Sequence, residues 1–117
     1  MKLRLPDGAY YLAGYAVEFA LKACVAKRTR RHEFPDKKRT EAVYTHKLAQ
    51  LVNEAGIKQA LADEARRDPS FNDNWNILQL WSEQSRYETH PLEEAEALLQ
   101  AINNRKHGVL ACIKRHW

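Results

Sequence analysis

The residues best placed to do chemistry in this sequence lie in its first apolar stretch, from Tyr10 to Lys27. At about 100° per residue in a helix, the polar side chains of this stretch fall within one stripe roughly 60° wide. The stripe consists of Tyr11, Tyr15, Glu18 and Lys22. Almost every other position is apolar, which is typical of a helix in the middle of a bundle rather than on its surface. We therefore expect the ionisable stripe to meet a polar partner or a cavity.

Glu18 admits two interpretations. In the simpler one, Glu18 and Lys22 form an i, i+4 ion pair on a solvated face, worth only a few tenths of a kcal/mol. In the functional one, Glu18 pairs with Arg86 in a semi-buried pocket that Tyr11, Tyr15 and Tyr87 line. Removing one partner of a buried pair costs several kcal/mol, so such a cluster requires full hydrogen bonding.

A second group able to do chemistry is Arg86-Tyr87, which follows a segment rich in tryptophan. A planar guanidinium beside an aromatic ring can receive a phosphate together with a base. The simpler interpretation is a cation at a helix end next to a packed tyrosine.

The positive charge of the chain is concentrated in one segment. The net charge is +4, and the run KRTRRHEFPDKKR from Lys27 to Arg39 holds seven Lys and Arg against Glu33 and Asp36, so the rest of the chain is slightly negative. Such a run is typical of a solvated loop, and it could equally neutralise nucleic-acid phosphates without reading sequence. The candidate phosphate contacts in this loop are Arg28, Arg30, Arg31, Lys37, Lys38 and Arg39.

The composition predicts one soluble, all-α domain over residues 1–117. Apolar residues make up 44% and charged residues 29%, as in globular proteins. Only 4 glycines and 4 prolines are present, too few for the many tight turns of a β-sandwich or barrel. We predict an antiparallel up-and-down helical bundle with extra short helices.

The helices that must position these side chains can be delimited from their breakers and caps. The first is expected to begin near Pro6–Asp7 and to fray near Lys27–Arg28, ahead of the basic loop. Short helices are expected over Thr45–Gly56, with Gly56 as the C-cap, and over Ile57–Arg66. Longer patterns follow at Phe71–Ser85 and from Pro91 to Ile102, then a connector and a last helix at Val109–Trp117.

Several other residues are assigned to structural roles. Trp75, Trp81 and Trp117 are expected in the core, and Cys24 and Cys112 read as reduced core residues of a cytoplasmic protein. His46 is expected to cap or pack at the start of its helix. No metal spacing, phosphate-cradling glycine loop or nucleophile elbow is present, so we expect neither a metal nor a cofactor. No segment has the length and hydrophobicity to span a membrane, and no signal peptide is visible.

The run YYLAGYAVEFALKA, together with Thr45-His46, the segment from Trp81 to Tyr87 and the closing GVL..IK..W, resembles the HEPN (higher eukaryotes and prokaryotes nucleotide-binding) domain. The resemblance covers nearly the whole chain. It implies an all-α bundle that is usually homodimeric and is often encoded beside a minimal nucleotidyltransferase in prokaryotes. The roles it implies range from toxin-like, metal-independent ribonuclease to non-catalytic nucleotide or RNA binding.

The ribonuclease branch of that family carries an arginine, four to six intervening residues and a histidine in a late helix. The histidine moves the proton of the 2′-hydroxyl and the arginine stabilises the charged phosphorane. In this chain only three residues separate Arg86 from His90, which departs from the pattern. Six residues separate Arg39 from His46, but this pair lies in the basic loop and the helix after it.

These observations together favour a domain that binds a nucleotide or RNA phosphate between the first helix and the Arg86-Tyr87 turn. Arg86 would hold phosphate, Tyr15 or Tyr87 would stack, Glu18 would orient Arg86, and Lys22 would add charge. One alternative is an endoribonuclease of a toxin–antitoxin pair that uses Arg86 and His90. A second is an interaction module whose small residues, Ala13, Gly14, Ala16 and Ala20, pack on a nucleotidyltransferase or a second copy; a helix-turn-helix DNA binder is disfavoured.

Overall fold

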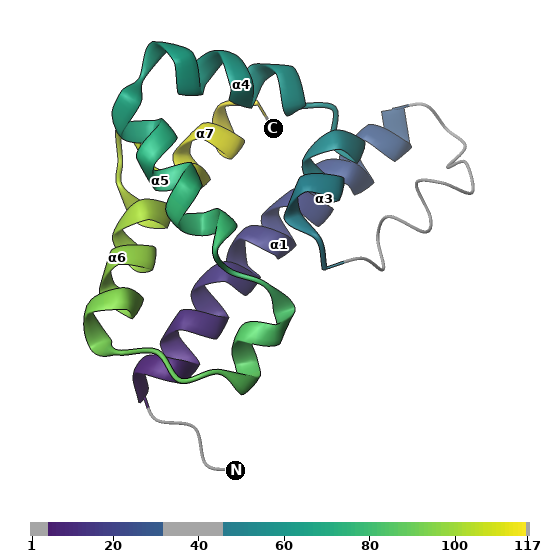
Figure 1. Ribbon diagram of the computed structural model, residues 1–117. Helices are drawn as coiled ribbons and strands as arrows, with labels where there is room; N and C mark the ends of the chain where they lie inside the picture. Colours follow the sequence, from purple (N-terminus) through teal and green to yellow (C-terminus); the bar gives the residue numbers. More distant parts are fainter. Residues whose placement is uncertain (1–4, 32–45, 117) are drawn as a thin grey trace.

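The computed structural model describes residues 5–31 and 46–116, except for the side chains of residues 29–31 and 86. Over these ranges the chain is an all-α helical bundle, which confirms the predicted fold class. The longest element is α1 (Leu5–Arg31), which runs diagonally across the molecule in Figure 1. None of the helices in the described ranges has both the length and the apolar character needed to cross a membrane.

Shorter helices pack around α1. They are α3 (Leu48–Glu54), α4 (Lys58–Arg67), α5 (Pro69–Gln79), the 3-10 helix η1 (Glu83–Tyr87), α6 (Leu92–Asn103) and α7 (Val109–Arg115). α1 contacts α3, η1, α6 and α7. In Figure 1, α4 and α7 lie at the end toward which α1 runs, whereas η1 and the start of α6 lie near the beginning of α1.

One hydrophobic core holds these elements together. Val17, Leu21 and Val25 form the buried face of α1 and are completely inaccessible to solvent. The other helices contribute fully or almost fully buried side chains to the same cluster, among them Leu51, Phe71, Leu78, Leu98, Val109 and Ile113. At roughly 1.5–3 kcal/mol for each fully buried large apolar side chain, this cluster is the main source of stability.

The two cysteines belong to this core, as predicted. Cys24 and Cys112 are buried and carry free thiols. Burial raises the pKa of both thiols, and the nearby cations Lys27 and Arg115 oppose this only in part. They are therefore packing residues rather than reactive thiols.

Several helix bounds follow the predictions closely. Gly56 ends α3 with a φ of 76°, a left-handed conformation that favours glycine. α6 begins directly after Pro91, with Glu93 and Glu94 in its first turn. α1, however, continues to Arg31, beyond the predicted fraying point near Lys27–Arg28. No glycine or proline interrupts these residues, and cations at a helix C-terminus are favourable.

The predicted helix over Phe71–Ser85 is wrong in its second half. α5 ends at Gln79, and a separate 3-10 helix begins at Glu83. Between them Trp81 leaves the helix and turns toward α1, where its Nε1 donates a hydrogen bond to the carbonyl of Tyr11 at 3.2 Å. Trp81 is buried as predicted, but Trp75 is only half-buried against the core. Trp117 lies outside the described residues.

The α4–α5 corner carries a pH-sensitive contact. One Asp68 carboxylate oxygen accepts a hydrogen bond from the backbone amide of Ser70 at 3.1 Å, which caps α5. The other oxygen lies 2.5 Å from Nδ1 of His107. The hydrogen bond from His107, helped by the backbone amides of Phe71 and Ser70, holds the pKa of Asp68 below its usual value although desolvation opposes it.

Because this pKa is lower in the folded chain, the stabilisation is complete above the unfolded pKa of about 3.9 and is lost as the pH falls through the folded value. Asp68→Asn keeps a good N-cap but has no carboxylate to face His107. We expect its melting temperature to lie below that of the wild type at about pH 5, and the gap to close toward about pH 2. Thermal unfolding followed by circular dichroism measures both gaps; an equal gap at the two pH values contradicts the assignment.

Candidate functional site

The acid at the centre of the predicted site is fully buried. Glu18 has 0% of its surface exposed, although it lies in the middle of α1. Its carboxylate contacts Nζ of Lys22 at 3.2 Å, and both of its oxygens lie 3.0 Å from Nδ1 of His46. A buried carboxylate is tolerated when its charge is balanced and its lone pairs are satisfied, and these two partners do both. The expectation that the stripe meets a polar partner is confirmed.

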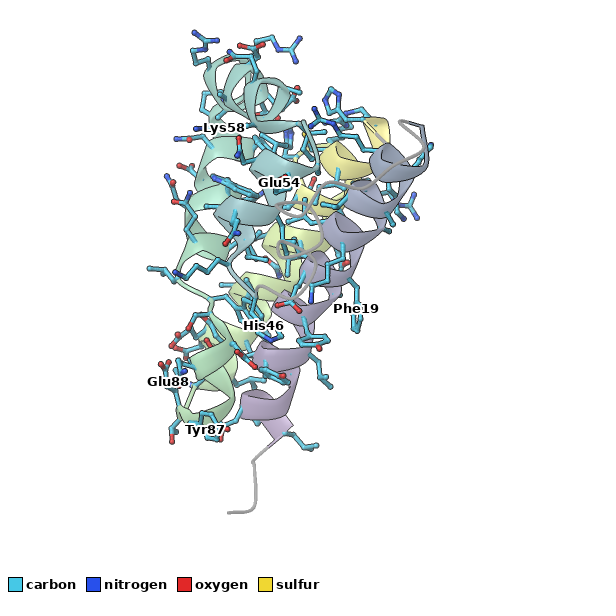
Figure 2. The ribbon with its side chains drawn as sticks, turned by 90° about the vertical axis from the view of Figure 1, so that its right-hand side faces the viewer. Phe19, His46, Glu54, Lys58, Tyr87 and Glu88 are labelled. Atoms are coloured by element: carbon cyan, nitrogen blue, oxygen red, sulfur yellow. The ribbon has the colours of Figure 1, made fainter. Side chains whose placement is uncertain are left out.

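His46 connects the buried acid to the surface. Its side chain is 35% exposed and lies against α1, as Figure 2 shows. While Nδ1 faces Glu18, Nε2 lies 3.3 Å from Glu83, whose side chain is 39% exposed. This histidine thus bridges two carboxylates and joins three segments: α1, the residues before α3, and η1. We call Glu18, Lys22, His46 and Glu83 the His46 network.

Aromatic rings flank the network along α1. The ring centroid of Tyr15 lies 6.5 Å from that of His46 and 4.6 Å from that of Phe19, which it meets edge-on. Tyr11 lies 5.6 Å from Tyr15 and stacks at 6.2 Å on Trp81. The aromatic and charged side chains of the polar stripe therefore lie next to one another and close to His46.

The network borders a pocket of about 770 Å³. Two segments line it, the residues at the start of α3 and those between α5 and η1: His46, Lys47, Leu48, Ala49, Gln79, Trp81, Ser82, Glu83 and Gln84. We call this the His46 pocket. It combines an apolar part with two amides, a hydroxyl, an exposed lysine, the imidazole and the carboxylate of Glu83, the mixture of groups found in sites for small polar ligands.

The Arg86-Tyr87 pair belongs to η1, which directly follows the residues lining the His46 pocket. The side chain of Arg86 lies outside the described part of the chain, and so does the predicted pair between Glu18 and Arg86. The partners that the structure gives Glu18 are Lys22 and His46. Tyr87 is 65% exposed.

His90, the histidine predicted for catalysis, lies elsewhere. Its side chain is 6% exposed, and its ring stacks on Tyr10 with centroids 3.7 Å apart. Nδ1 lies 3.1 Å from the Glu94 carboxylate, and the backbone amide donates to Asp7 at 2.5 Å. The pKa of Tyr10, the ring on which His90 stacks, is raised mainly by burial and to a smaller extent by the carboxylates of Glu94 and Glu88. His90 thus packs the start of α1 against α6 and does not line the His46 pocket.

Of the predicted phosphate contacts in the basic loop, Arg28 is the one whose side chain is described. Its Nη1 donates to the carbonyl of Glu54 at 3.4 Å, at the C-terminal end of α3. A cation is favourable at this end of a helix. The side chains of Arg30 and Arg31, and all of Lys37, Lys38 and Arg39, lie outside the described residues.

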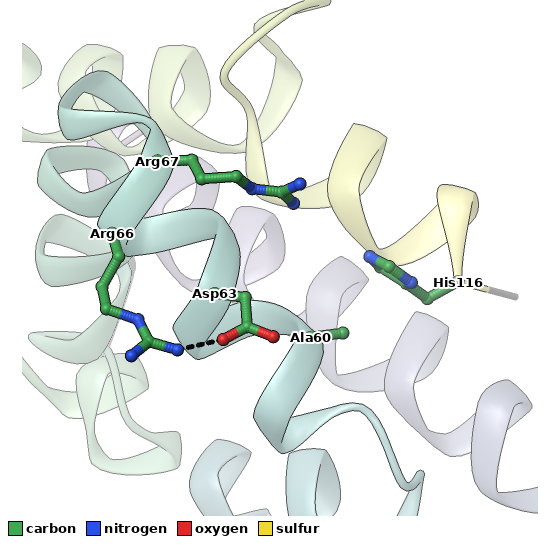
Figure 3. A pocket seen from close by; sticks show the side chains of 5 residues that line it. All are labelled: Ala60, Asp63, Arg66, Arg67 and His116. Atoms are coloured by element: carbon green, nitrogen blue, oxygen red, sulfur yellow. Dashed lines mark hydrogen bonds and ion pairs between the residues drawn. The ribbon is translucent and has the colours of Figure 1, made fainter.

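A second pocket, of about 460 Å³, lies between α4 and the end of α7. Figure 3 shows its lining, which includes Arg66, Arg67 and His116. Arg66 is paired with Asp63, and Arg67 with Glu64 at 2.7 Å. Both guanidinium groups of this pocket therefore face carboxylates, as His46 does in the His46 pocket.

The part of the chain that the structure describes holds no group of three or more His, Cys, Asp and Glu residues able to bind a metal ion. Two residues of this candidate site, His46 and Glu83, are not among the site residues predicted from the sequence. His46 was assigned only to the start of its helix, and that helix folds back on α1 so that the histidine meets Glu18. The sequence feature that indicates such a residue is Glu18 itself, because a buried acid on a largely apolar helix needs a polar partner from another segment.

No family model, no curated protein and no solved structure gave a significant match to this chain.

Proposed function

We propose that this chain binds a nucleotide or an RNA phosphate in the His46 pocket. The observation that carries the proposal is His46 itself, which a fully buried Glu18 holds in place at the wall of a pocket of about 770 Å³. An imidazole whose Nδ1 faces a buried carboxylate has a fixed orientation, and a fixed donor at the pocket wall favours a phosphate ligand. The volume lies in the range typical of small-molecule sites.

The lining supplies separate groups for the parts of such a ligand. Lys47 is exposed at the pocket, and Lys22 lies beside His46 through their shared contact with Glu18. Gln79 and Gln84 provide amides that can both donate to and accept from a base edge. In this proposal Arg86 adds phosphate contact from the same 3-10 helix as Gln84, and Tyr15 or Tyr87 stacks on the base.

Calorimetric titration with ATP and with a short single-stranded RNA tests the proposal. We expect wild-type protein to bind one of the two ligands, and Lys47→Ala and Arg86→Ala each to weaken that binding about tenfold or more, as for a lost charged hydrogen bond. Lys58→Ala is the matched control, because Lys58 is an exposed lysine on α4 outside the pocket. No heat with either ligand, or equal affinity in all variants, contradicts the proposed site.

A second candidate is an endoribonuclease, and the geometry of His46 favours it over His90 as the base. Its Nδ1 is held by a carboxylate while the ring borders a pocket, as general acid–base catalysis requires. In this reaction the imidazole takes the proton of the 2′-hydroxyl, the 2′-oxygen attacks phosphorus, and the 5′-oxygen leaves with a proton, giving a 2′,3′-cyclic phosphate.

Incubation of a short RNA with the protein, without added metal, tests this candidate. Cleavage that is lost in His46→Gln and retained in His90→Gln supports it, provided that both variants unfold at temperatures near that of the wild type. Cleavage that is retained in His46→Gln excludes His46 as the base. The nucleotidyltransferase partner stays a prediction from the family resemblance.

A further inference from the structure

α1 has a second apolar face, which the rest of the domain leaves uncovered. Leu5, Leu12 and Phe19 on this face are 91%, 63% and 58% exposed, and Figure 2 shows Phe19 pointing away from the body of the domain. The face also includes Ala9, Ala16, Ala23 and Ala26, all at least partly exposed. We call these seven residues the α1 stripe. Three large exposed side chains on one helix face, with no charged residue among them, mark an interaction surface.

The spacing of the α1 stripe is that of a coiled-coil seam. Its positions alternate steps of four and three residues from Leu5 to Ala26, over about 32 Å of helix at 1.5 Å per residue. Leu5, Leu12, Phe19 and Ala26 occupy one heptad position, and alanines occupy the other. Alanine at every second seam position lets two helix backbones approach closely, while the leucines and the phenylalanine fill the space beside them.

The small-residue face predicted from sequence differs from this stripe. Gly14 and Ala13, which were expected to meet a partner, are buried within the chain. A side chain on Gly14 would overlap the ring of Trp81, so the close approach at this glycine is made inside the domain. Ala16 is the member of that predicted face that remains exposed in the α1 stripe.

The family resemblance already implies a homodimer; for its interface we propose the α1 stripe, which pairs with the same stripe of a second copy of this chain with the two α1 helices antiparallel. In one antiparallel register every large residue faces an alanine of the partner copy. Leu12 then lies opposite the Ala16 position and Leu5 opposite the Ala23 position. The same register places Phe19 opposite the Ala9 position, so all six residues are matched at once. Such a two-fold arrangement is self-complementary and closes as a dimer.

The distribution of charge favours an antiparallel over a parallel pair. Exposed carboxylates of Glu88 and Glu94 lie where α1 begins, beside His90 and Tyr10. Exposed Lys27 lies near the end of α1, and Arg115 lies at the end of α7, where it faces Glu64 at 3.4 Å. A parallel pair would place like charges together at both ends, whereas an antiparallel pair places the acidic end of one copy beside the basic end of the other. The helix dipoles also favour the antiparallel pair, because they then point in opposite directions.

Light scattering coupled to size-exclusion chromatography tests the surface. Wild-type protein should have twice the chain mass of 13.6 kDa. Ala16→Glu, which places charge in the middle of the stripe, should have the mass of a single chain at the same concentration. The matched control is Leu92→Glu, because Leu92 is also a large exposed residue, at 59%, but lies on α6 outside the stripe. Its mass should equal that of the wild type. A monomeric wild type, or a dimeric Ala16→Glu protein, overturns the proposal.

Disulfide trapping tests the orientation. Leu12→Cys and Ala16→Cys proteins, carrying tags of different mass, are oxidised separately and as a mixture. The antiparallel register predicts that the mixed disulfide forms at least tenfold faster than either self-disulfide, since cysteine pairs need Cα atoms within about 7 Å. The buried Cys24 and Cys112 should not compete. A parallel pair would favour the self-disulfides, and a stripe bound to lipid vesicles without cross-linking would indicate a membrane-surface role; either result overturns the proposal.

Discussion

Glu18→Gln is expected to destabilise the fold by about 2–3 kcal/mol, below the full cost of an unpaired buried charge because its partners can be hydrated. The substitution removes the negative charge that balances Lys22 and faces His46, while keeping the size of the side chain. It leaves the Lys22 ammonium and the His46 ring facing a neutral amide at a position with 0% exposure. Urea unfolding followed by tryptophan fluorescence measures the change in free energy.

Glu83→Gln is the control for this substitution. Glu83 also contacts His46, at 3.3 Å, but its side chain is 39% exposed. Water can therefore replace most of what the carboxylate supplies, and the expected loss is under about 1 kcal/mol. If the two glutamine variants lose the same free energy, burial of Glu18 is not what makes the contact important.

Gly14→Ala is expected to destabilise the fold by about 2 kcal/mol, as for overpacking of a core. A Cβ atom at this position would overlap the six-membered and five-membered rings of the Trp81 indole, so the ring or the helix must shift. The shift would also strain the hydrogen bond from Trp81 to the Tyr11 carbonyl. The change in unfolding free energy is again measured with urea.

Gly8→Ala provides the opposite expectation on the same helix. No atom lies within 4 Å of a Cβ added at Gly8, so alanine gains its helix propensity without a clash and should stabilise by about 0.5 kcal/mol. In a Trp81→Leu background, the additional cost of Gly14→Ala should fall, because the smaller side chain leaves room. An unchanged cost in that background would mean that the indole ring is not the obstacle.

The bounds of the helices were predictable where local chemistry determines them. Pro91 followed by acids marks the start of α6, and Gly56 in the left-handed conformation marks the end of α3. The end of α5 was not predictable, because Trp81 continues the helical spacing of Phe71 and Leu78. The indole ring of Trp81 instead packs against Gly14, which is far away in sequence, and no local pattern contains that contact.

The candidate site was predictable to the same degree. The helical wheel of α1 indicates that Glu18 meets a polar partner or a cavity, and it leaves open an ion pair with Lys22 on a solvated face; in the structure Glu18 contacts Lys22 and is fully buried. The wheel does not identify the partner of Glu18, because His46 lies 28 residues away in sequence and reaches Glu18 only through the packing of α3 on α1. Glu83, in turn, meets His46 because η1 packs on the other side of it.

The most direct measurement of the proposed binding is a set of amide NMR spectra of the protein during titration with ATP and with a short single-stranded RNA. The account predicts that the largest shifts fall on residues 46–49 and 79–84, with Lys22 and Tyr15 next, and that α4 is unaffected. Shifts confined to the pocket of Arg66, Arg67 and His116, or no shifts at millimolar ligand, would contradict it.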